Sequence, residues 1–586
     1  MKRNRSGIKK LKTPFFNEGM TDIPWNIYPR PQMKRNSFFC LNGAWDFEIK
    51  RGKDFPHEYS RKINVPFPPE SELSGVMATP KKNEYLYYRR YFSLPKGFKK
   101  DVIILHFGAV DGCCEIFING KSVHINECGC LPFSLDVTNL LNDGENELKV
   151  RVKDDTSPTY PYGKQRKKRG GMWYTPISGI WQTVWLESLP KNYIKSLKIT
   201  QTESYARITV TGVKGQKKLT LSENGECFEF STNEITIAPK SPKRWTPDTP
   251  YLYYFKLTVG DDEIESYFAL RSIGICDTPL GKCLSLNKKP YLFNGLLDQG
   301  YFPDGIFLPP SHKGYENDIL TAKRLGFNTL RKHIKIEPLF FYHLCDKLGI
   351  IVFQDAVNNG RYSFIQDTAL PTLGFKKKSD KHMHRNDANR KNFLRCADGM
   401  IQLLYNTPSV LYYTIFNEGW GQFCADSIYE RFKSADETRI IDSTSGWFWQ
   451  KKSDVDSHHV YFKKINLVPK NRPLVISEFG GYSHRVEEHC FGSKNYGYAR
   501  YHSKQDFEKA ITSLYEDELI PLARNGASAF IYTQLSDVED ETNGFVTYDR
   551  QVVKADTEIL TDLCKRLTAE FNKANKNEQK VPEEYE

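Results

Sequence analysis

Short runs of alternating apolar and polar residues fill the chain from about residue 38 to residue 187, a pattern typical of half-buried strands. The clearest runs are 44–49, 87–94, 102–107, 115–118, 147–152 and 182–186. Glycine, asparagine, aspartate and proline separate them, as in the turn Asn119-Gly120. The pattern predicts an antiparallel β-sandwich over residues 38–190, preceded by a lead-in over residues 1–37.

A second set of alternating runs follows at 206–211, 218–221 and 252–259. Together they make a smaller β unit of the size of an immunoglobulin-like sandwich, expected over residues 191–273.

After about residue 284 apolar runs alternate with amphipathic stretches of helical period, which predicts parallel strands joined by helices. Eight candidate strands are at 291–297, 328–333, 350–355, 410–417, 439–443, 457–461, 474–478 and 527–533. Helices are expected over 315–325, from Pro338 to 347–349, and over 507–523. The count predicts a (β/α)8 barrel over residues 274–586.

Charge does not indicate a nucleic-acid partner, although the chain carries a net charge of +12. The basic runs are 1–12 (MKRNRSGIKKLK) and 164–169 (KQRKKR). No zinc finger, helix-turn-helix or RNA-binding aromatic motif accompanies them, so both are expected to be solvated surface. The alternative, nucleic-acid binding through the 164–169 loop, would show affinity that falls steeply with salt.

The basic start is not followed by the apolar run of a secretory signal, and no stretch of about 18 apolar residues occurs. A cytoplasmic protein without a membrane partner is expected. The 13 cysteines, including Cys113-Cys114 and the pair Cys128 and Cys130, show irregular spacing and no CxxC repeat. Reduced thiols fit this better than a disulfide framework or a zinc site. No third ligand accompanies 382–384 (HMH) or 458–459 (HH), so neither metal nor cofactor is expected.

Two glutamates end apolar strands of the expected barrel. Glu418 closes the run 411–418 (LYYTIFNE), and Glu478 closes 474–478 (LVISE). Barrel enzymes carry their reactive groups at the carboxyl ends of the strands, where burial shifts the pKa of a carboxyl group. A pair of carboxyl groups roughly 5–5.5 Å apart is what a retaining glycosidase needs.

At these residues the sequence resembles glycoside hydrolase family 2, which comprises β-galactosidases, β-glucuronidases and β-mannosidases. The motifs that carry the likeness are 28–32 (YPRPQ), 41–47 (LNGAWDF), 65–70 (VPFPPE), 88–92 (YRRYF), 179–185 (GIWQTVW), 245–252 (WTPDTPYL) and 268–271 (FALR). The resemblance implies a jelly-roll, galactose-binding-like N-terminal sandwich, an immunoglobulin-like domain and a catalytic barrel. It also makes a homo-oligomer plausible.

The resemblance further implies that Glu418 is the acid/base and Glu478 the nucleophile. Asn417 would hydrogen-bond the sugar 2-hydroxyl, and Arg331 would hold a nearby carboxylate ionised. Tyr461 resembles a tyrosine that donates a hydrogen bond to the nucleophile.

Other substrate-binding candidates are His333, Asp298, Gln299, Trp420, Trp447 and Tyr532. Asp298 and Gln299 follow strand one and present groups that bind sugar hydroxyls. The tryptophans can stack on a sugar face, as can Trp449.

Several positions depart from the family pattern. The motif around His333 is altered, Thr407 replaces a histidine in 406–409 (NTPS), and Tyr532 stands where a tryptophan is expected. These changes predict an altered pocket. Residues 537–543 also lack the Asn-x-Lys pair with which β-glucuronidases of the family bind the uronate, which argues against a glucuronide because a buried carboxylate needs a cation.

The leading interpretation is a retaining exo-glycosidase that cleaves terminal β-linked sugars, β-galactosidase being the first choice. The alternatives are an arabinosidase, β-mannosidase or β-glucuronidase of the same family, or a non-catalytic carbohydrate-binding protein.

Overall fold

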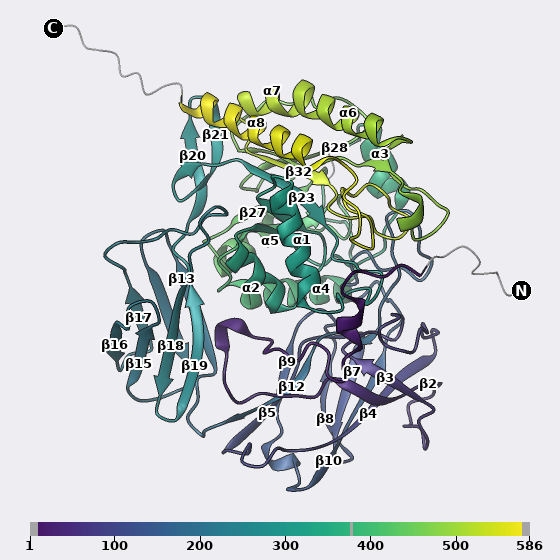
Figure 1. Cartoon of the computed structure of the whole chain (residues 1–586), viewed down its shortest axis with the longest axis vertical. Helices are drawn as coiled ribbons and strands as arrows, with labels where there is room; N and C mark the ends of the chain where they lie inside the picture. The colour runs from purple at the N-terminus through teal and green to yellow at the C-terminus, as the bar shows by residue number, and fades with distance from the viewer. Residues whose placement is uncertain (1–9, 376–378, 577–586) are drawn as a thin grey trace, which may run out of the picture.

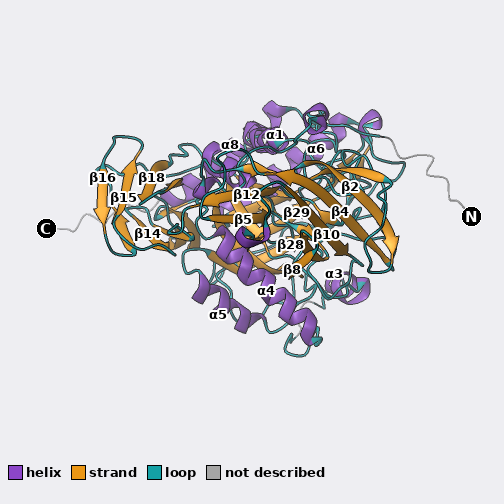
Figure 2. Ribbon diagram, turned by 90° about the horizontal axis from the view of Figure 1, so that it is seen from below, coloured by secondary structure: helices purple, strands orange, loops and turns teal. Residues whose placement is uncertain are grey.

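The structure is a computed structural model that describes residues 10–375 and 379–576. Figure 1 shows the barrel in teal to yellow in the upper part of the view, the N-terminal sandwich in purple and blue below it, and a smaller β unit beside them. Figure 2 shows this smaller unit projecting from one end of the molecule. The three predicted architectures are therefore present.

The N-terminal sandwich packs a six-stranded sheet, ordered β3-β2-β4-β10-β7-β8, against a four-stranded sheet, ordered β1-β12-β5-β9. Along β10 buried residues alternate with more exposed ones, as the sequence pattern requires. The strands are β1 (Phe39–Cys40), β2 (Gly43–Arg51), β3 (Arg61–Val65), β4 (Glu84–Ser93), β5 (Val102–Phe107), β6 (Val110–Asp111), β7 (Cys113–Ile118), β8 (Lys121–Asn126), β9 (Phe133–Asp136), β10 (Glu145–Lys153), β11 (Gly179–Ile180) and β12 (Val184–Leu189).

The smaller unit is a two-sheet antiparallel sandwich with a core of its own, as the alternating runs predicted. One sheet has the order β13-β14-β17 and the other β16-β15-β18-β19. The strands are β13 (Ser196–Gln201), β14 (Ala206–Thr211), β15 (Lys217–Leu221), β16 (Cys227–Phe230), β17 (Glu234–Ile237), β18 (Tyr253–Val259) and β19 (Asp262–Phe268).

All eight predicted barrel strands form one parallel sheet, ordered β27-β26-β25-β24-β23-β32-β29-β28, and the end strands β27 and β28 contact each other. The barrel strands are β23 (Phe293–Asp298), β24 (Thr329–Lys332), β25 (Ile351–Asp355), β26 (Val410–Asn417), β27 (Ile440–Ser445), β28 (Asp456–Val460), β29 (Leu474–Gly480) and β32 (Ala529–Thr533). Two small sheets of the C-terminal part lie outside the barrel sheet. They consist of β20 (Ile273–Thr278), β21 (Gly281–Leu286) and β22 (Lys289–Pro290), and of β30 (Tyr482–His484) and β31 (Ala499–Tyr501).

The helices follow the predicted pattern with one difference. The helix expected over 507–523 is interrupted by a π turn, η6, two residues before Pro521. Proline has no N–H to donate to the carbonyl four residues earlier, so the hydrogen-bond register changes there. The α-helices are α1 (His312–Arg324), α2 (Leu339–Leu348), α3 (Leu370–Thr372), α4 (Asp387–Leu404), α5 (Ala425–Ala435), α6 (Lys504–Leu514), α7 (Ile520–Arg524) and α8 (Thr557–Lys576). Short turns are η1 (Phe16–Met20), η2 (Pro31–Met33), η3 (Thr138–Leu140), η4 (Ile365–Ala369), η5 (Glu487–His489) and η6 (Tyr515–Leu519).

The described part of the lead-in, residues 10–37, connects all three units. Trp25 donates its indole N–H to the Pro309 carbonyl on the barrel at 3.0 Å. Arg35 is buried and pairs with Asp262 of the smaller sandwich at 2.8 Å. The lead-in is therefore part of the interface between the units.

Among the described residues, no helix has both the length and the apolar character that crossing a membrane requires.

Tight packing inside the barrel makes Gly295 on β23 sensitive to substitution. A Cβ added there would lie 2.6 Å from the Thr329 carbonyl oxygen and 2.9 Å from Ile531 Cδ1. We expect Gly295→Ala to destabilise the protein by about 1–3 kcal/mol, because strand backbones cannot move apart freely. Gly144→Ala, with no atom within 4 Å of its added Cβ, is the matched control and should change stability by less than about 0.5 kcal/mol. Urea unfolding checks this, and equal effects would contradict the packing.

Candidate active site

The two glutamates converge at the carboxyl end of the barrel. Glu418 directly follows β26, the fourth barrel strand, and Glu478 lies in β29, the seventh. Three atoms lie within 4.8 Å of one another: a carboxylate oxygen of Glu418, a carboxylate oxygen of Glu478 and a ring nitrogen of His459. Glu478 is buried and Glu418 is half-buried, so their side chains meet inside the barrel mouth. This separation suits a pair of carboxyl groups that act on one anomeric carbon from opposite sides.

Arg331 on β24 lies at the centre of this group and is 1% exposed. Its guanidinium donates to Glu478 Oε1 at 3.0 Å and to Asn417 Oδ1 at 2.8 Å. It also donates to Asp355 Oδ1 at 3.0 Å. The planar donor set of arginine fixes several acceptors at once, so three strands are positioned through one side chain.

Asp355 ends β25 and orients a second side chain of the site, His333. Its Oδ2 accepts a hydrogen bond from Nδ1 of His333 at 2.8 Å, and His333 lies 4.0 Å from Glu478. Burial raises the pKa of the Asp355 carboxyl, but Arg331 and His333 outweigh burial and leave this pKa below its usual value. Asp355 is therefore ionised and fixed.

Tyr461 lies just beyond β28 and donates its hydroxyl to Glu478 Oε2 at 2.5 Å. The same hydroxyl is 2.9 Å from Thr533 Oγ1, and its ring stacks on Tyr498 at 3.9 Å. With Arg331 on Oε1, both oxygens of Glu478 have a donor, which orients its carboxylate.

His459 lies between the two glutamates. Its Nδ1 is 2.9 Å from Glu418 Oε1, and its Nε2 is 3.5 Å from Glu478 Oε1 and 2.8 Å from Ser445 Oγ. Burial lowers the pKa of His459 to about 3, so its ring is neutral at ordinary pH. Burial also raises the pKa of Glu418, which favours its protonated form. Burial thus favours a proton on Glu418, whereas Glu478 accepts hydrogen bonds from Arg331 and Tyr461.

A long loop of the N-terminal sandwich, residues 154–178 between β10 and β11, packs on the loops that follow the barrel strands β25 and β32. Lys164, half-buried on this loop, is close enough to Glu418 to oppose the effect of burial and lower the pKa of that carboxyl. Its charge also acts on Glu541 and His333. Its ammonium is 5.8 Å from the Trp173 ring centroid, and no carboxylate of the described residues lies within 4.0 Å of it. The loop thus adds a cation to the site.

Contacts on both sides hold this loop in place. Gly163 has φ +61°, and a Cβ there would lie 2.8 Å from the Ile334 carbonyl oxygen, so only glycine permits this approach. Arg169 lies 3.4 Å from carboxylate oxygens of Glu539 and Asp540. The loop is therefore anchored to the barrel rim.

The expectation of a solvated basic loop is consequently wrong for three of its residues. Arg166, Lys167 and Lys168 are exposed, but Gln165 is buried, and Lys164 and Arg169 are half-buried against the barrel. Ion pairs with residues about 370 positions away hold Arg169, and a local charge count cannot detect such partners. For the lead-in, residues 1–9 lie outside the described residues, and Lys10 and Lys12 are exposed.

The tryptophans near the mouth are mainly packed. Trp420 is 3% exposed, donates to the Gly360 carbonyl at 3.2 Å and meets Trp173 edge to face at 5.2 Å. Trp447 donates to the backbone carbonyl of Glu418 at 2.9 Å. Both therefore support the site walls, and the indole of Trp447 helps to fix the turn at Glu418, whose φ is 54°.

Two residues predicted to contact sugar have partners within the protein. Asp298 is buried and pairs with Lys332 at 2.5 Å, so its carboxylate is occupied within the protein. Tyr532 stacks on Phe545 at 4.4 Å in the core. Successive residues of a strand face opposite sides, so Thr533 is the residue of β32 that reaches the site. Gln299 is buried with no hydrogen-bond partner for its Oε1 among the described residues, and its role stays a prediction.

Thr407 does not alter the pocket either. It precedes β26 and therefore lies at the opposite end of the barrel from Glu418. The neighbouring Asn406 accepts from the Ile199 backbone N–H at 2.7 Å in the smaller sandwich. The segment 406–409, in which Thr407 differs from the family pattern, thus lies at a contact between the barrel and the smaller sandwich.

Glu418, His459 and Glu478 also form a possible set of metal ligands. The Arg331 guanidinium lies 3.0 Å from Glu478 Oε1 and 3.4 Å from His459 Nε2. A cation bound by these atoms would be next to a buried positive charge, which is unfavourable at this distance.

The sequence reasoning missed His459, Asp355, Thr533, Lys164 and Glu541 as site residues. For Asp355 a signal was available, because it also is an acidic residue that ends an apolar strand. His459 precedes Tyr461 by two positions, so both face the same side of the strand. Lys164 and Glu541 offer no such local signal.

The fold and the paired carboxylates define a multidomain (β/α)8-barrel protein of the glycoside hydrolase class. The matching family descriptions are "Glycosyl hydrolases family 2, sugar binding domain" over residues 54–190, "Glycosyl hydrolases family 2" over residues 191–274 and "Glycosyl hydrolases family 2, TIM barrel domain" over residues 281–521. The chain belongs to glycoside hydrolase family 2, as its motifs indicated.

Curated relatives include the β-galactosidase of Lactococcus lactis, 25% identical over 523 residues, which cover 82% of this chain and 47% of that protein. The β-galactosidase of Aeromonas hydrophila is 25% identical over 493 residues, or 75% of this chain and 44% of that protein. The chain therefore spans about half the length of the curated relatives it matches.

Solved structures with the same fold include a β-glucuronidase of Dictyoglomus thermophilum, with a TM-score of 0.72, 17% identity and coverage of 92% of this chain and 98% of that one. A β-galacturonidase of Eisenbergiella tayi has a TM-score of 0.67, 19% identity and coverage of 93% and 98%. These chains match nearly end to end, which shows the shared fold.

The buried contacts of Asp355 predict a measurable stability cost. Asp355→Asn leaves Arg331 and His333 with a neutral partner in the barrel interior, and we expect a loss of about 3–5 kcal/mol in unfolding free energy. Asp143→Asn is the control, because Asp143 is 97% exposed beside Lys99 and its pair contributes at most about 1 kcal/mol. Urea unfolding followed by tryptophan fluorescence measures both. A loss for Asp355→Asn no larger than the control would contradict the assigned network.

Proposed function

We propose that this chain is a retaining exo-glycosidase that hydrolyses terminal β-linked sugars through a covalent glycosyl-enzyme. The observation that carries the proposal is the pair Glu418 and Glu478, with oxygens within 4.8 Å of each other at the barrel mouth and in different hydrogen-bond environments. Two carboxyl groups at such a separation fit double displacement, because an inverting enzyme needs room for a water molecule between them.

In the first step the Glu478 carboxylate attacks the anomeric carbon, and the bond from that carbon to the leaving oxygen breaks. Glu418 gives its proton to the leaving oxygen. The raised pKa of Glu418 supports this role because the carboxyl group must hold a proton in the free enzyme. Arg331 and Tyr461 orient Glu478 for the attack.

In the second step the Glu418 carboxylate takes a proton from water, whose oxygen attacks the same carbon and releases Glu478. Two inversions give net retention. The side-chain carbonyl of Asn417 accepts from Arg331, so its Nδ2 is the group available to donate to the sugar 2-hydroxyl. That contact strengthens as positive charge develops on the sugar ring.

The roles of the two glutamates predict different kinetic defects. Glu478→Gln should lower kcat by at least about 10³-fold on every substrate, because the nucleophile is lost. Glu418→Ala should strongly lower kcat/KM for substrates with poor leaving groups and spare kcat/KM for dinitrophenyl glycosides, whose leaving group needs no proton, while kcat falls because the second step loses its base. Glu488→Gln, an exposed glutamate of η5, is the control and should behave as wild type.

A panel of aryl glycosides with leaving groups of graded pKa measures these effects. Equal losses of kcat/KM for Glu418→Ala across the panel would contradict its role as the acid. Failure of the folded wild-type protein on every sugar would favour a carbohydrate-binding protein.

For the sugar, β-galactoside is the first choice, because curated relatives with that activity match most of the chain. A second candidate is a sugar that carries a carboxylate, and Lys164 is the observation that favours it. The absent Asn-x-Lys pair argued against an anionic sugar only as long as no other cation faced the site. Lys164 supplies one, and no carboxylate of the described residues pairs with it within 4.0 Å.

The variant Lys164→Met distinguishes the two candidate substrates, a β-galactoside and a sugar that carries a carboxylate. If the substrate is a uronide, kcat/KM should fall about 10- to 100-fold, the effect of a charge-assisted hydrogen bond, while turnover of the β-galactoside changes less. Lys167→Met, exposed on the same loop, is the control. Aryl β-galactosides, β-galacturonides and β-glucuronides are the test substrates. Unchanged uronide turnover would remove this candidate.

The same variant predicts a pH effect. Lys164 lowers the pKa of Glu418, so removing its charge should raise that pKa. The acid then keeps its proton to higher pH, and the basic limb of the kcat/KM profile should move to higher pH. A shift to lower pH, or none, would contradict the placement of Lys164 beside Glu418.

A further inference from the structure

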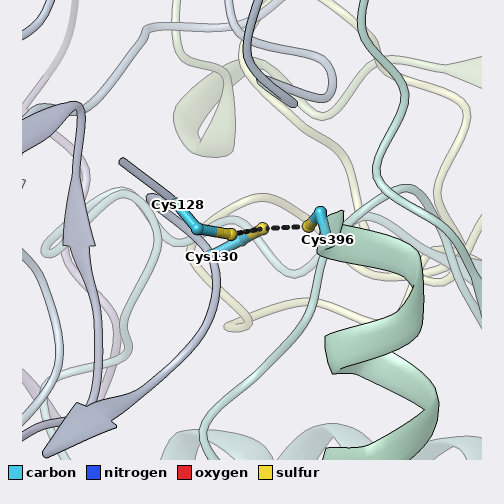
Figure 3. A group of neighbouring side chains, drawn as sticks. All are labelled: Cys128, Cys130 and Cys396. Atoms are coloured by element: carbon cyan, nitrogen blue, oxygen red, sulfur yellow. Dashed lines mark hydrogen bonds between the residues drawn. The ribbon is translucent and has the colours of Figure 1, made fainter. Parts of the chain in front are cut away.

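Three cysteines that do not belong to the site described above meet where the N-terminal sandwich contacts the barrel. Cys128 and Cys130 lie in the loop between β8 and β9, and Cys396 lies on α4. Figure 3 shows the three sulfurs pointing toward one another, with Cys130 in the middle. The Sγ atoms of Cys128 and Cys130 are 3.8 Å apart, those of Cys130 and Cys396 are 2.7 Å apart, and all three lie within 4.8 Å of one another.

The loop that carries the first two thiols is held in one conformation. A Cβ at Gly129 would lie 2.3 Å from Asp111 Oδ1, so the residue between the two cysteines has no room for a side chain. The Gly129 carbonyl accepts the indole N–H of Trp181 at 3.0 Å, and the Cys128 carbonyl accepts from the Asn126 amide at 2.9 Å. The Cys-Gly-Cys turn therefore presents both sulfurs to the same side.

The helix that carries the third thiol, α4, packs directly against this loop. At Gly399, one turn after Cys396, an added Cβ would lie 2.2 Å from Leu131 Cδ1. Arg395 donates to the Glu127 carbonyl at 3.0 Å. These contacts on either side of the cluster fix the distance between loop and helix.

The geometry points to a thiolate site for a single soft d10 metal ion of the Zn²⁺ type, formed by Cys128, Cys130 and Cys396. Thiolate sulfur is the donor that such ions prefer, and three converging thiols from two domains provide the ligand set of a structural site. Cysteine spacing did not reveal this site, because the third ligand lies 266 residues after the second.

The distances suit one shared ion. With zinc–sulfur bonds of about 2.3 Å in tetrahedral geometry, sulfurs lie about 3.8 Å apart. Cys128 and Cys130 already have this separation. Cys130 and Cys396 need to separate by about 1 Å, within the reach of a side-chain adjustment. Cys130 is half-buried and lines a cavity of about 250 Å³, from which water can fill a fourth coordination position.

A disulfide between Cys130 and Cys396 is the competing chemistry. It would use two sulfurs and release two electrons to an oxidant, and it would leave Cys128 as a buried thiol without a role. An ion uses all three sulfurs and needs no oxidant, only the loss of thiol protons. Its effect would be to fasten the sandwich to α4, the helix that precedes the strand of Glu418.

The test is direct metal binding by the full chain, purified with a non-thiol reductant and stripped of metal. With Zn²⁺ as the probe, we expect one equivalent per chain, protection of three thiols from alkylation, and release of the ion by a thiol-modifying mercurial. With Cd²⁺ as the probe, a sulfur-to-metal charge-transfer absorption should appear in the near ultraviolet. These wild-type readouts do not depend on any variant folding or on catalysis.

Cys130→Ser and Cys128→Ser should each lower Zn²⁺ affinity by at least about 10-fold. Cys227→Ser, an exposed cysteine outside the cluster, is the control and should keep wild-type binding. The proposal is overturned if the reduced protein binds no Zn²⁺, if it binds only an adventitious ion that both cluster variants retain, or if peptide mapping finds a Cys130–Cys396 disulfide that persists under the reductant.

Discussion

One buried guanidinium holds the site together. Arg331 has almost no exposed surface, yet it contacts Asp355, Asn417 and Glu478, which lie on three other strands of the barrel. A buried arginine is tolerated only where acceptors satisfy its donors and carboxylates balance its charge. The need to satisfy this one residue therefore fixes the groups that surround Glu478. The cost of burying its charge is offset by those same contacts, so stability and catalytic geometry depend on the same atoms.

The barrel alone does not complete the pocket. The N-terminal sandwich contributes the loop that carries Lys164, and Gly163 and Arg169 anchor it to the barrel rim. The charge of Lys164 acts on Glu418, so a domain remote in sequence adjusts the pKa of that carboxyl group. If the thiol cluster at Cys396 binds an ion, it fixes the same interface from a second side. The arrangement of the domains is then a determinant of the chemistry, in addition to the barrel fold.

Much of this could be predicted from the sequence. Apolar runs marked all eight barrel strands, and the acidic residues that end two of them led to Glu418 and Glu478. What could not be predicted depends on side-chain direction and distant partners. Asp298 and Tyr532 were assigned to the site, but both point elsewhere: one pairs with Lys332 and the other packs on Phe545. Lys164 joins the site only because two domains dock, and no local pattern encodes that. The same holds for Cys396, whose partners lie more than 260 residues earlier.

In the proposed reaction Glu478 forms a covalent bond to the sugar. The most direct test is incubation with a 2-deoxy-2-fluoro glycoside that carries a dinitrophenyl leaving group, followed by peptide mass spectrometry. The fluorine slows both steps, and the good leaving group lets the first step proceed, so the intermediate accumulates. The account predicts one fluoroglycosyl group per chain, attached to Glu478. A label on a different residue, or product of inverted configuration with no covalent species, would contradict it.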